Sequence, residues 1–140
     1  MAATDYADFT RLLTADIREH GKVTSGPLAG RPLMVLTTTG AKTGASREAI
    51  VTFTRDGDRY VIAGSKSGAP THPAWYHNLV ANPTVTVEAE GQKFSARARV
   101  TEGEERQRLW DRHVAERPEF GEYPKMTNRL IPVIVLDRVA

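Results

Sequence analysis

The spacing of hydrophobic residues changes several times along the chain, from steps of three and four residues to strict alternation. This pattern predicts a mixture of helices and paired strands. Near the N-terminus, apolar side chains recur at steps of three and four residues, the spacing of one helix face: Tyr6, Phe9, Leu13 and Ile17. Gly21 follows this stripe and is suited to end a helix. We therefore expect an amphipathic helix over residues 1–21, with its apolar stripe turned to the core.

Runs typical of strands begin at Pro32. The segment "LMVLTTT" is followed by "EAIVTFTRDGDRYVIAG", in which two β-rich runs flank Asp56-Gly57, a dipeptide suited to a tight hairpin turn. Further on, "TVTVEAEGQKFSARARVT" alternates apolar and polar residues and breaks at Glu90-Gly91, which predicts a second hairpin. The run "IPVIVLDRV" predicts a last strand near the C-terminus.

Two further helices are expected among these strands. In "THPAWYHNLVANP", Pro73 suits a first helical turn and Asn82-Pro83 suits a stop. In "TEGEERQRLWDRHVAER", Thr101 is a candidate N-cap with Glu104 three residues later, as in a capping box. Because hairpins outnumber strand–helix–strand crossovers, the economical architecture is an antiparallel barrel with short helices packed on it. This is an α+β class that is mainly β.

The length of 140 residues suits one domain with its own core, so we expect residues 1–140 to form a single unit. Within it, the helix of residues 1–21 precedes a barrel of residues 32–140. Hydrophobic residues make up 40% and charged residues 26%, close to the average for globular proteins.

Charge and composition exclude several classes of function. Nineteen Lys and Arg against seventeen Asp and Glu are interspersed, so we expect no nucleic-acid partner. The chain has no cysteine, so redox chemistry requires a cofactor. With no basic leader and no apolar run long enough to span a membrane, we expect a cytoplasmic protein.

The four histidines do not form a metal-binding pattern. His72 and His77 lie five residues apart without a nearby cysteine or paired carboxylate, so we expect no metal. His20 and His113 fall in the predicted amphipathic helices, where we expect them to face solvent or the margin of the core.

The loop "TTTGAKTGASR" is the first candidate binding element. Its glycines, hydroxyls, Lys42 and Arg47 favour an anionic ligand. A nucleotide P-loop is excluded because Ala41, not glycine, precedes Lys42. A flexible hairpin loop with two solvated cations is the alternative interpretation.

A second cluster, "AGSKSGAPTHPAWYHNLVANP", brings Lys66, glycines, hydroxyls and aromatic residues to another strand-to-helix junction. Glycines and hydroxyls of this kind occur where the backbone approaches a ligand closely. Lys42, Arg47 and Lys66 can converge on phosphate and carboxylate groups, while the segment of Trp75 and Tyr76 supports a ring system. A large, planar, anionic cofactor suits both clusters.

Together, "LTTTGAKTGASR" and "GSKSGAPTHPAWYHNLVANP" resemble the deazaflavin-dependent nitroreductase family, also called the coenzyme F-420-dependent quinone reductases. The resemblance runs from about Pro32 to the C-terminus and includes "TNRLIPVIVL". It implies a split β-barrel like that of FMN-binding oxidoreductases. It also implies a reduced deazaflavin, coenzyme F-420, with a phosphate and an oligoglutamate tail.

Matched position by position, the resemblance implies which residues bind the coenzyme. The phosphate and tail would be held by Lys42, Thr43, Gly44 and Arg47. Residues Ile50 and Val51 would run beside the coenzyme. The deazaflavin ring would lie at the segment of Gly64, Ser65 and Lys66 and at the motif positions Trp75, Tyr76 and Asn78.

The resemblance also implies an acceptor pocket formed by "RPEFGEYPKMTNRLIP", with Phe120, Tyr123 and Met126 as its residues. Relatives can carry further tyrosines where this chain has Arg117 and Phe120, so hydroxyls are missing here. The hypothesis is hydride transfer from the reduced coenzyme to a quinone-like, enone-like or nitro-aromatic acceptor. Ser65 and Tyr123 are the candidate catalytic residues because either hydroxyl can hydrogen-bond a developing oxyanion.

Two other functions remain open from the sequence. One is a deazaflavin-binding carrier without efficient turnover, and the other is an FMN-binding or heme-related split barrel. A lipophilic quinone acceptor would be compatible with peripheral contact at the inner face of the cell membrane. The sequence is compatible with a monomer or a homodimer.

Overall fold

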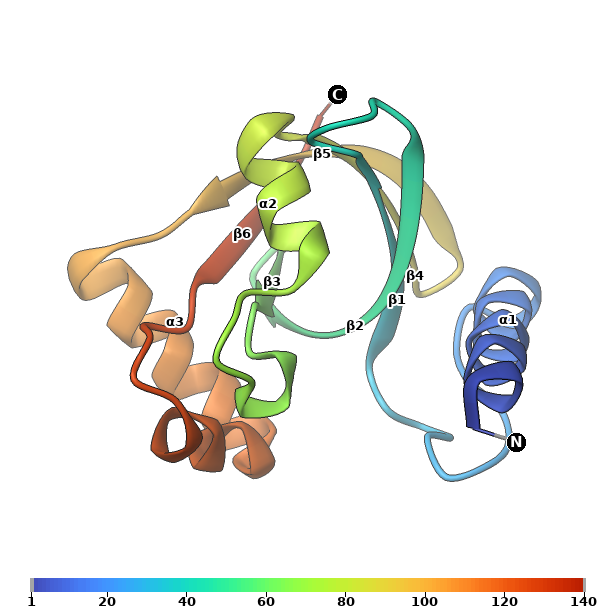
Figure 1. Cartoon of the computed structure of the whole chain (residues 1–140), viewed down its shortest axis with the longest axis horizontal. Helices are drawn as coiled ribbons and strands as arrows, with labels where there is room; N and C mark the ends of the chain where they lie inside the picture. Colours follow the sequence, from blue (N-terminus) through green and yellow to red (C-terminus); the bar gives the residue numbers. More distant parts are fainter. Residues whose placement is uncertain (1, 140) are drawn as a thin grey trace.

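The computed structural model describes the backbone of residues 2–139 and the side chains of residues 9–66 and 68–139. Six antiparallel strands form a closed barrel in the order β1-β2-β3-β6-β5-β4, and β4 pairs with β1 to complete the circle (Figure 1). The strands are β1 (Leu33–Thr39), β2 (Ser46–Asp56), β3 (Arg59–Ala63), β4 (Thr84–Ala89), β5 (Gln92–Val100) and β6 (Val133–Arg138). The predicted mainly β barrel is confirmed.

Both predicted hairpins are present. The turn between β2 and β3 contains Gly57 with φ of 62°, and the β4–β5 turn contains Glu90 and Gly91 with φ of 54° and 80°. Positive φ values at these positions give the backbone twist that a tight hairpin requires. The register across them pairs Asp56 with Arg59 and Ala89 with Gln92.

Helices cover the barrel at three places (Figure 1). Helix α1 (Ala2–His20) packs on β1 and β4, α2 (Ala74–Ala81) packs on β1, and α3 (Gly103–Glu116) packs on β2, β3 and β6. Two 3-10 turns, η1 (Lys66–Gly68) and η2 (Pro118–Met126), lie against each other. Within the described residues, no helix combines the length and the apolar character needed to cross a membrane.

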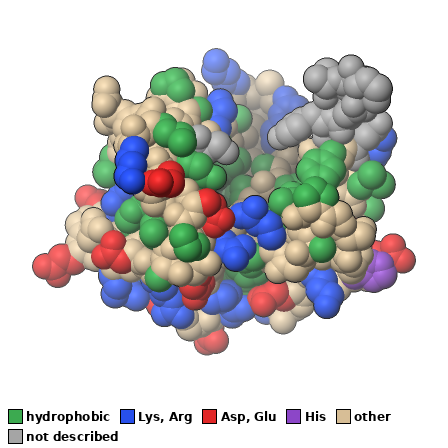
Figure 2. Space-filling view, turned by 90° about the horizontal axis from the view of Figure 1, so that it is seen from below, with side chains coloured by type: hydrophobic (Ala, Val, Ile, Leu, Met, Phe, Trp, Pro, Cys, Tyr) green, Lys and Arg blue, Asp and Glu red, His purple; other side chains and the backbone are tan. Residues whose placement is uncertain are grey.

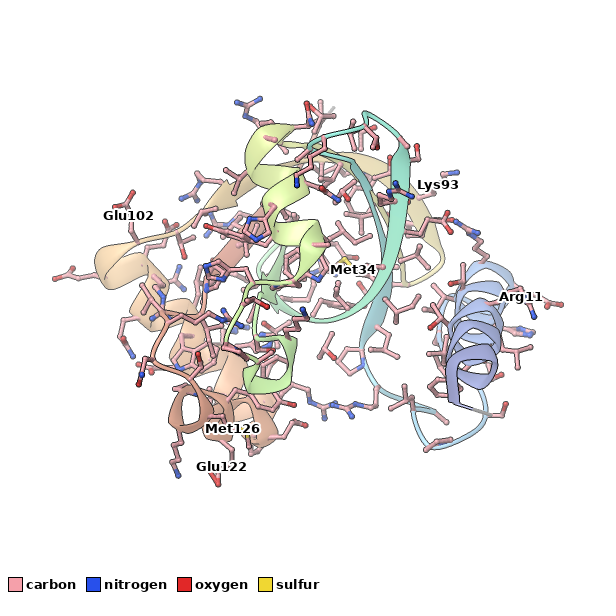
Figure 3. All side chains as sticks on the ribbon, viewed as in Figure 1. Arg11, Met34, Lys93, Glu102, Glu122 and Met126 are labelled. Atoms are coloured by element: carbon pink, nitrogen blue, oxygen red, sulfur yellow. The ribbon has the colours of Figure 1, made fainter. Side chains whose placement is uncertain are left out.

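The interior of the barrel is closely filled by inward-facing side chains. Met34, labelled inside the barrel in Figure 3, packs there with Leu36, Ile62, Val87 and Ile134, and all five are fully buried. Alternate residues of the same strands form two outer clusters, one beneath α3 and η2 and one beneath α1. The continuous apolar runs of β1, β3 and β6 therefore bury both faces of the sheet, whereas β5, which alternates apolar and polar residues, buries one face only.

The first helix begins and ends close to the predicted bounds, and Gly21 follows its last residue with φ of 76°. Leu13 and Ile17 are buried as expected, whereas Phe9 is 39% exposed because it lies at the rim of the cleft described below. The side chain of Tyr6 lies outside the described residues.

Two local predictions for the third helix are wrong. The N-cap is Glu102, not Thr101, and no side chain caps the helix. Thr101 is buried, and its hydroxyl instead donates to the carbonyl of Val133 on β6 (2.8 Å). His113 is fully buried, not exposed or marginal, because α3 lays this side of the helix on the barrel and Thr54 of β2 hydrogen-bonds its Nδ1 (2.9 Å).

Candidate functional site

One edge of the first part of β2 is unpaired, although the six strands close into a barrel. The first seven residues of β2, Ser46 to Thr52, pair with β1, and pairing with β3 begins only at Phe53. No other strand in the described part of the chain pairs with the free edge. The amide of Phe53 donates to the carbonyl of Pro32 on the β1 side (2.9 Å). Because backbone groups alternate between the two edges, those of Glu48, Ile50 and Thr52 point to the open side.

A cleft of about 660 Å³ lies along this open edge. Figure 2 looks toward the hollow from below and shows apolar side chains inside it, with basic side chains gathered at the near edge. The cleft brings together many of the residues predicted for the site: Ile50, Val51, Ser65, Lys66, Trp75, Phe120 and Tyr123. They come from β2, from the β3–α2 connection with the start of α2, and from η2, so residues far apart in sequence share one cavity.

Ser65 and Lys66 sit where β3 passes into the connection to α2. Ser65 is 6% exposed, and Lys66 has a left-handed backbone with φ of 46°. Gly68 is also left-handed, with φ of 82°, and a Cβ there would meet the side chain of Met126 at 2.8 Å. Gly64 does not line the cleft, and a Cβ at this position would meet the ring of Pro132 at 2.8 Å. The connection is therefore tightly packed against Met126 and Pro132.

Arg129, which neither candidate motif contains, is hydrogen-bonded to the β3–α2 connection. It hydrogen-bonds the carbonyls of Gly64 (3.0 Å) and Ser65 (2.7 Å) and the Nδ1 of His72 (2.9 Å), all in the β3–α2 connection. An arginine donates and does not accept, so His72 is neutral at Nδ1 in this contact. Burial lowers the pKa of His72, and the charge of Arg129 lowers it further. An arginine in "TNRLIP", directly before the last strand, is the only sequence signal for this role.

The three motif positions of α2 have different surroundings. Trp75 lines the cleft, while Tyr76 packs on the barrel and its ring contacts that of His72 (centroids 4.6 Å apart). Asn78 is buried: its Oδ1 accepts from the amide of Ala41 (3.0 Å) and its Nδ2 donates to Thr38 (3.1 Å). Asn78 thus fixes the β1–β2 loop on α2.

The predicted anion-binding residues lie outside the cleft lining, on the β1–β2 loop and, for Arg47, at the start of β2. Lys42, Thr43, Gly44 and Arg47 are all exposed. The loop is closed by backbone hydrogen bonds from Gly40 to Ala45 (2.7 Å) and from Gly44 to Gly40 (2.9 Å). Ile50 lies three residues after Arg47 along β2, a distance of about 10 Å in an extended strand. An elongated ligand is needed to occupy both places.

The wall opposite α1 is made by η2. Phe120 is buried, and its ring contacts those of Tyr123 (centroids 5.2 Å apart) and His113 (4.4 Å). Tyr123 reaches the cleft, so two of the three predicted pocket residues lie there. Met126 does not line it: its side chain is 62% exposed and lies at Gly68, as its position at the outer edge in Figure 3 indicates.

Residues before Pro32, which no sequence motif assigns to the site, also line the cleft. Phe9, Thr10 and Leu13 of α1 and Leu28 and Arg31 of the connection to β1 line it. Arg31 pairs with Glu119 of η2 (3.1 Å) and so joins the two sides of the opening. The stripe on α1 signalled only burial, because a helix face that covers a core and one that covers a cleft have the same period. Among the described residues, no group of three His, Asp or Glu side chains is placed to hold a metal ion.

An apolar cleft beside an open strand edge, with basic residues about 10 Å away along β2, gives a barrel suited to a long, anionic ligand. Residues 9–138 match the family described as F420H(2)-dependent quinone reductase, and the chain belongs to this family. Its cofactor is coenzyme F-420, and its members are oxidoreductases. The resemblance noted from the two sequence motifs is confirmed.

Comparisons with individual proteins agree with this assignment. The chain is 41% identical over 112 residues to an F420H(2)-dependent quinone reductase from Mycobacterium tuberculosis. The aligned part covers 76% of this chain and 74% of that protein. The chain is also 41% identical to the structure of an F420-H2 dependent reductase, with a TM-score of 0.71 over 76% of this chain and 95% of the other. A chain solved as a domain-swapped dimer is 37% identical, with a TM-score of 0.73 over 97% of this chain and all of the other. The barrel is accordingly of the split type.

Proposed function

We propose that this chain transfers a hydride from reduced coenzyme F-420 to a quinone-like acceptor in the cleft beside β2. The observation that carries this proposal is the convergence of Ile50, Ser65, Lys66, Trp75 and Tyr123 on one cavity along an open strand edge. The family supports the coenzyme and the reaction type.

The residues present suit the coenzyme at both of its ends. Lys42 and Arg47 supply charge-assisted hydrogen bonds to phosphate and carboxylate groups, and Thr43 and Gly44 shape the loop that presents them. The free backbone groups of Ile50 and its neighbours suit the polar edge of a flat ring system. Trp75 and Val51 exclude water from that ring, while Asn78 and Tyr76 act from behind by holding the loop and α2 in place.

When bound, reduced coenzyme F-420 supplies the hydride. Ser65 and Tyr123 hydrogen-bond an acceptor oxygen and stabilise the negative charge that develops on it as the hydride arrives. Tyr123 or water gives the proton that completes the reduction, so a quinone becomes a hydroquinone. Enone-like and nitro-aromatic compounds are further acceptors for the same geometry, because each gains negative charge on oxygen.

The first experiment is a fluorescence titration of the purified protein with coenzyme F-420 and, separately, with FMN. It is followed by oxidation of the reduced coenzyme by menadione or another menaquinone analogue. We expect binding of coenzyme F-420, and turnover with the quinone. Binding of FMN in its place would overturn the coenzyme assignment, and tight binding of coenzyme F-420 without turnover would indicate a carrier.

The matched control tests the basic loop. Lys42→Ala with Arg47→Ala removes two positive charges at the proposed tail site, and we expect a loss of affinity of about 100-fold, about tenfold for each charged contact. Lys93→Ala with Arg97→Ala removes the same charge from exposed positions on β5 and should leave the affinity unchanged. Equal losses in both double variants would mean that net charge alone attracts the coenzyme.

We further propose a cytoplasmic protein whose acceptor is a lipophilic quinone reached by peripheral contact with a membrane. Exposed apolar side chains on α1 and η2 support this: Phe9, Leu12 and Met126. When anionic phospholipid vesicles are sedimented, the wild type should be found in the pellet and a Leu12→Ser variant should stay in the supernatant. If neither protein is found in the pellet, the membrane contact is contradicted. A monomer and a homodimer are both compatible with the cleft, whose described lining comes from one chain.

A further inference from the structure

The side chain of Arg129 lies at the centre of the β3–α2 connection. Its Nε donates to the carbonyl of Ala69 (3.0 Å), its Nη1 to the carbonyl of Gly64 (3.0 Å) and its Nη2 to the carbonyl of Ser65 (2.7 Å). Nη1 also contacts the Nδ1 of His72 (2.9 Å). One guanidinium therefore holds four groups that are spread over nine residues of chain.

The contacts of Arg129 differ from those of a surface arginine. Within the described residues, no carboxylate lies at ion-pair distance from it, whereas Arg18, Arg59 and Arg99 all have such partners. Burial lowers the pKa of Arg129. Its half-buried guanidinium is directed at carbonyl oxygens and an imidazole, which satisfy its hydrogen-bond donors but do not neutralise its charge.

The connection has a backbone that needs such support. Lys66 adopts a left-handed conformation, which costs free energy for a residue with a side chain and persists only where surrounding contacts impose it. The adjacent Ser65 is buried and lines the cleft together with Lys66. Arg129 bonds the carbonyl of Ser65 itself, so it acts directly on the peptide unit that leads into the strained residue.

We propose that Arg129 is a positioning residue that holds Ser65 and Lys66 in the shape required to bind coenzyme F-420. The identity of the ligand rests on the proposed function. The role of Arg129 in holding the loop rests only on its hydrogen bonds. Arg129 does not line the cleft, so it acts through the backbone of the connection.

The geometry requires arginine. A planar guanidinium donates in several fixed directions at once, whereas the ammonium group of lysine is a compact point charge on a flexible stem. Lysine at this position keeps the charge but cannot hold carbonyls on both sides of η1 together. Arg129→Lys therefore separates the geometry of the fork from its charge.

The test combines hydrogen exchange of the protein without coenzyme and fluorescence titration with coenzyme F-420. It compares the wild type with Arg129→Lys, Arg129→Ala and the control Arg106→Ala. Arg106 is a second arginine whose pKa burial lowers, and it donates to the carbonyl of Ile131 (2.6 Å) from the α3 side. The amides of Gly68 and Ala69, which close η1, are the reporters because they donate to Ser65 and Lys66.

Both Arg129 variants should exchange these two amides about tenfold faster and bind the coenzyme about tenfold more weakly, the effect of one lost charge-assisted hydrogen bond. Arg106→Ala should change neither property. Wild-type exchange and affinity in Arg129→Lys would overturn the proposal, as would equal losses in Arg106→Ala. If Arg129→Ala does not fold, Arg129→Lys decides. If the wild type does not bind the coenzyme, the proposed function fails, and the exchange rates still decide whether Arg129 holds the loop.

Discussion

Tyr123 and Ser65 face the same cleft from two segments that are far apart in the sequence. The ring of Tyr123 is held by its contact with Phe120, so loss of its hydroxyl should leave the wall in place. Ser65 is fixed through its backbone by Arg129. Substitutions that remove only the hydroxyl of Tyr123 or Ser65 should therefore test that group without moving the rest of the cleft.

Tyr123→Phe should lower kcat for menadione by about tenfold to 100-fold and leave the Kd of coenzyme F-420 unchanged, because the lost hydrogen bond acts on the acceptor oxygen. Steady-state kinetics and fluorescence titration measure the two effects. Tyr60→Phe is the matched control, since Tyr60 packs in the barrel interior and does not line the cleft. An unchanged kcat in Tyr123→Phe would make Tyr123 an aromatic wall residue only.

His113 should make the stability of the protein depend on pH. Burial lowers its pKa to about 4, with smaller effects of Glu119 and Arg117, while an unfolded chain has a histidine pKa of about 6.5. Between these values the unfolded state binds more protons, so stability is fully present above pH 6.5 and falls as the pH drops toward 4. The loss attributable to His113 should approach about 3 kcal/mol.

Urea denaturation of the wild type and His113→Asn at pH 7 and pH 4.5 measures this difference. Asparagine keeps an amide able to hydrogen-bond Thr54 but does not titrate in this range. We expect a smaller drop in the free energy of unfolding for the variant. Equal drops in both proteins would show that the carboxylates, not His113, control the acid sensitivity.

At the scale of elements, α1 is attached to the barrel by one arginine as well as by its apolar face. Arg18 hydrogen-bonds Glu88 of β4 (2.9 Å) and also pairs with Glu48 of β2. These hydrogen bonds lower the pKa of Glu88 and raise that of Arg18. Since Phe9, Thr10 and Leu13 form one wall of the cleft, the attachment of α1 decides whether this wall is present.

Arg18→Ala should cost about 1 kcal/mol of stability, because it leaves the mostly buried Glu88 carboxylate without this partner. Hydrogen exchange of α1 should increase more than that of the barrel. Adding Glu88→Gln should recover part of the loss, since a neutral amide needs no counter-charge. Leu12→Ala, a change at an exposed position of the same helix, is the control. Unchanged exchange of α1 in Arg18→Ala would contradict the assigned role.

The elements were predictable to the extent that local rules decide them. The hairpins at Asp56-Gly57 and Glu90-Gly91 and the short helix after Pro73 follow from turn chemistry and were predicted correctly. Thr101 failed as an N-cap because a tertiary partner, the carbonyl of Val133, takes its hydroxyl. His113 failed for a similar reason, since burial of that side of α3 depends on what the helix covers.

At the scale of the whole molecule, β1, β3 and β6 each contribute to two apolar clusters. Ile62 faces the inner cluster and Val61 the outer one, and Leu36 and Val35 divide in the same way. Disruption of one cluster therefore affects the others. This sharing supports the prediction that residues 1–140 behave as one domain, which a single calorimetric unfolding transition would test.

Coenzyme F-420 should stabilise the folded protein by mass action. At about 100 times its Kd, a ligand that binds only the folded state adds about 2.7 kcal/mol, which corresponds to a rise in Tm of roughly 8 °C for a domain of this size. Differential scanning fluorimetry measures the shift. FMN at the same concentration should give none, and the Lys42→Ala, Arg47→Ala double variant should give less than the wild type. An equal shift with FMN would contradict the selectivity.

The sequence by itself determined the period of each element, the turns between them and the two motifs that indicate the family, because these depend on residues close together along the chain. Only the tertiary structure decided that Ser65, Tyr123 and α1 share a cleft, that β2 has an open edge, and that Arg129 holds the β3–α2 connection. Each of these contacts joins segments whose meeting depends on the closure and register of the barrel. A hydrogen bond across 64 residues, such as that of Arg129 to Ser65, leaves no periodic trace in the sequence.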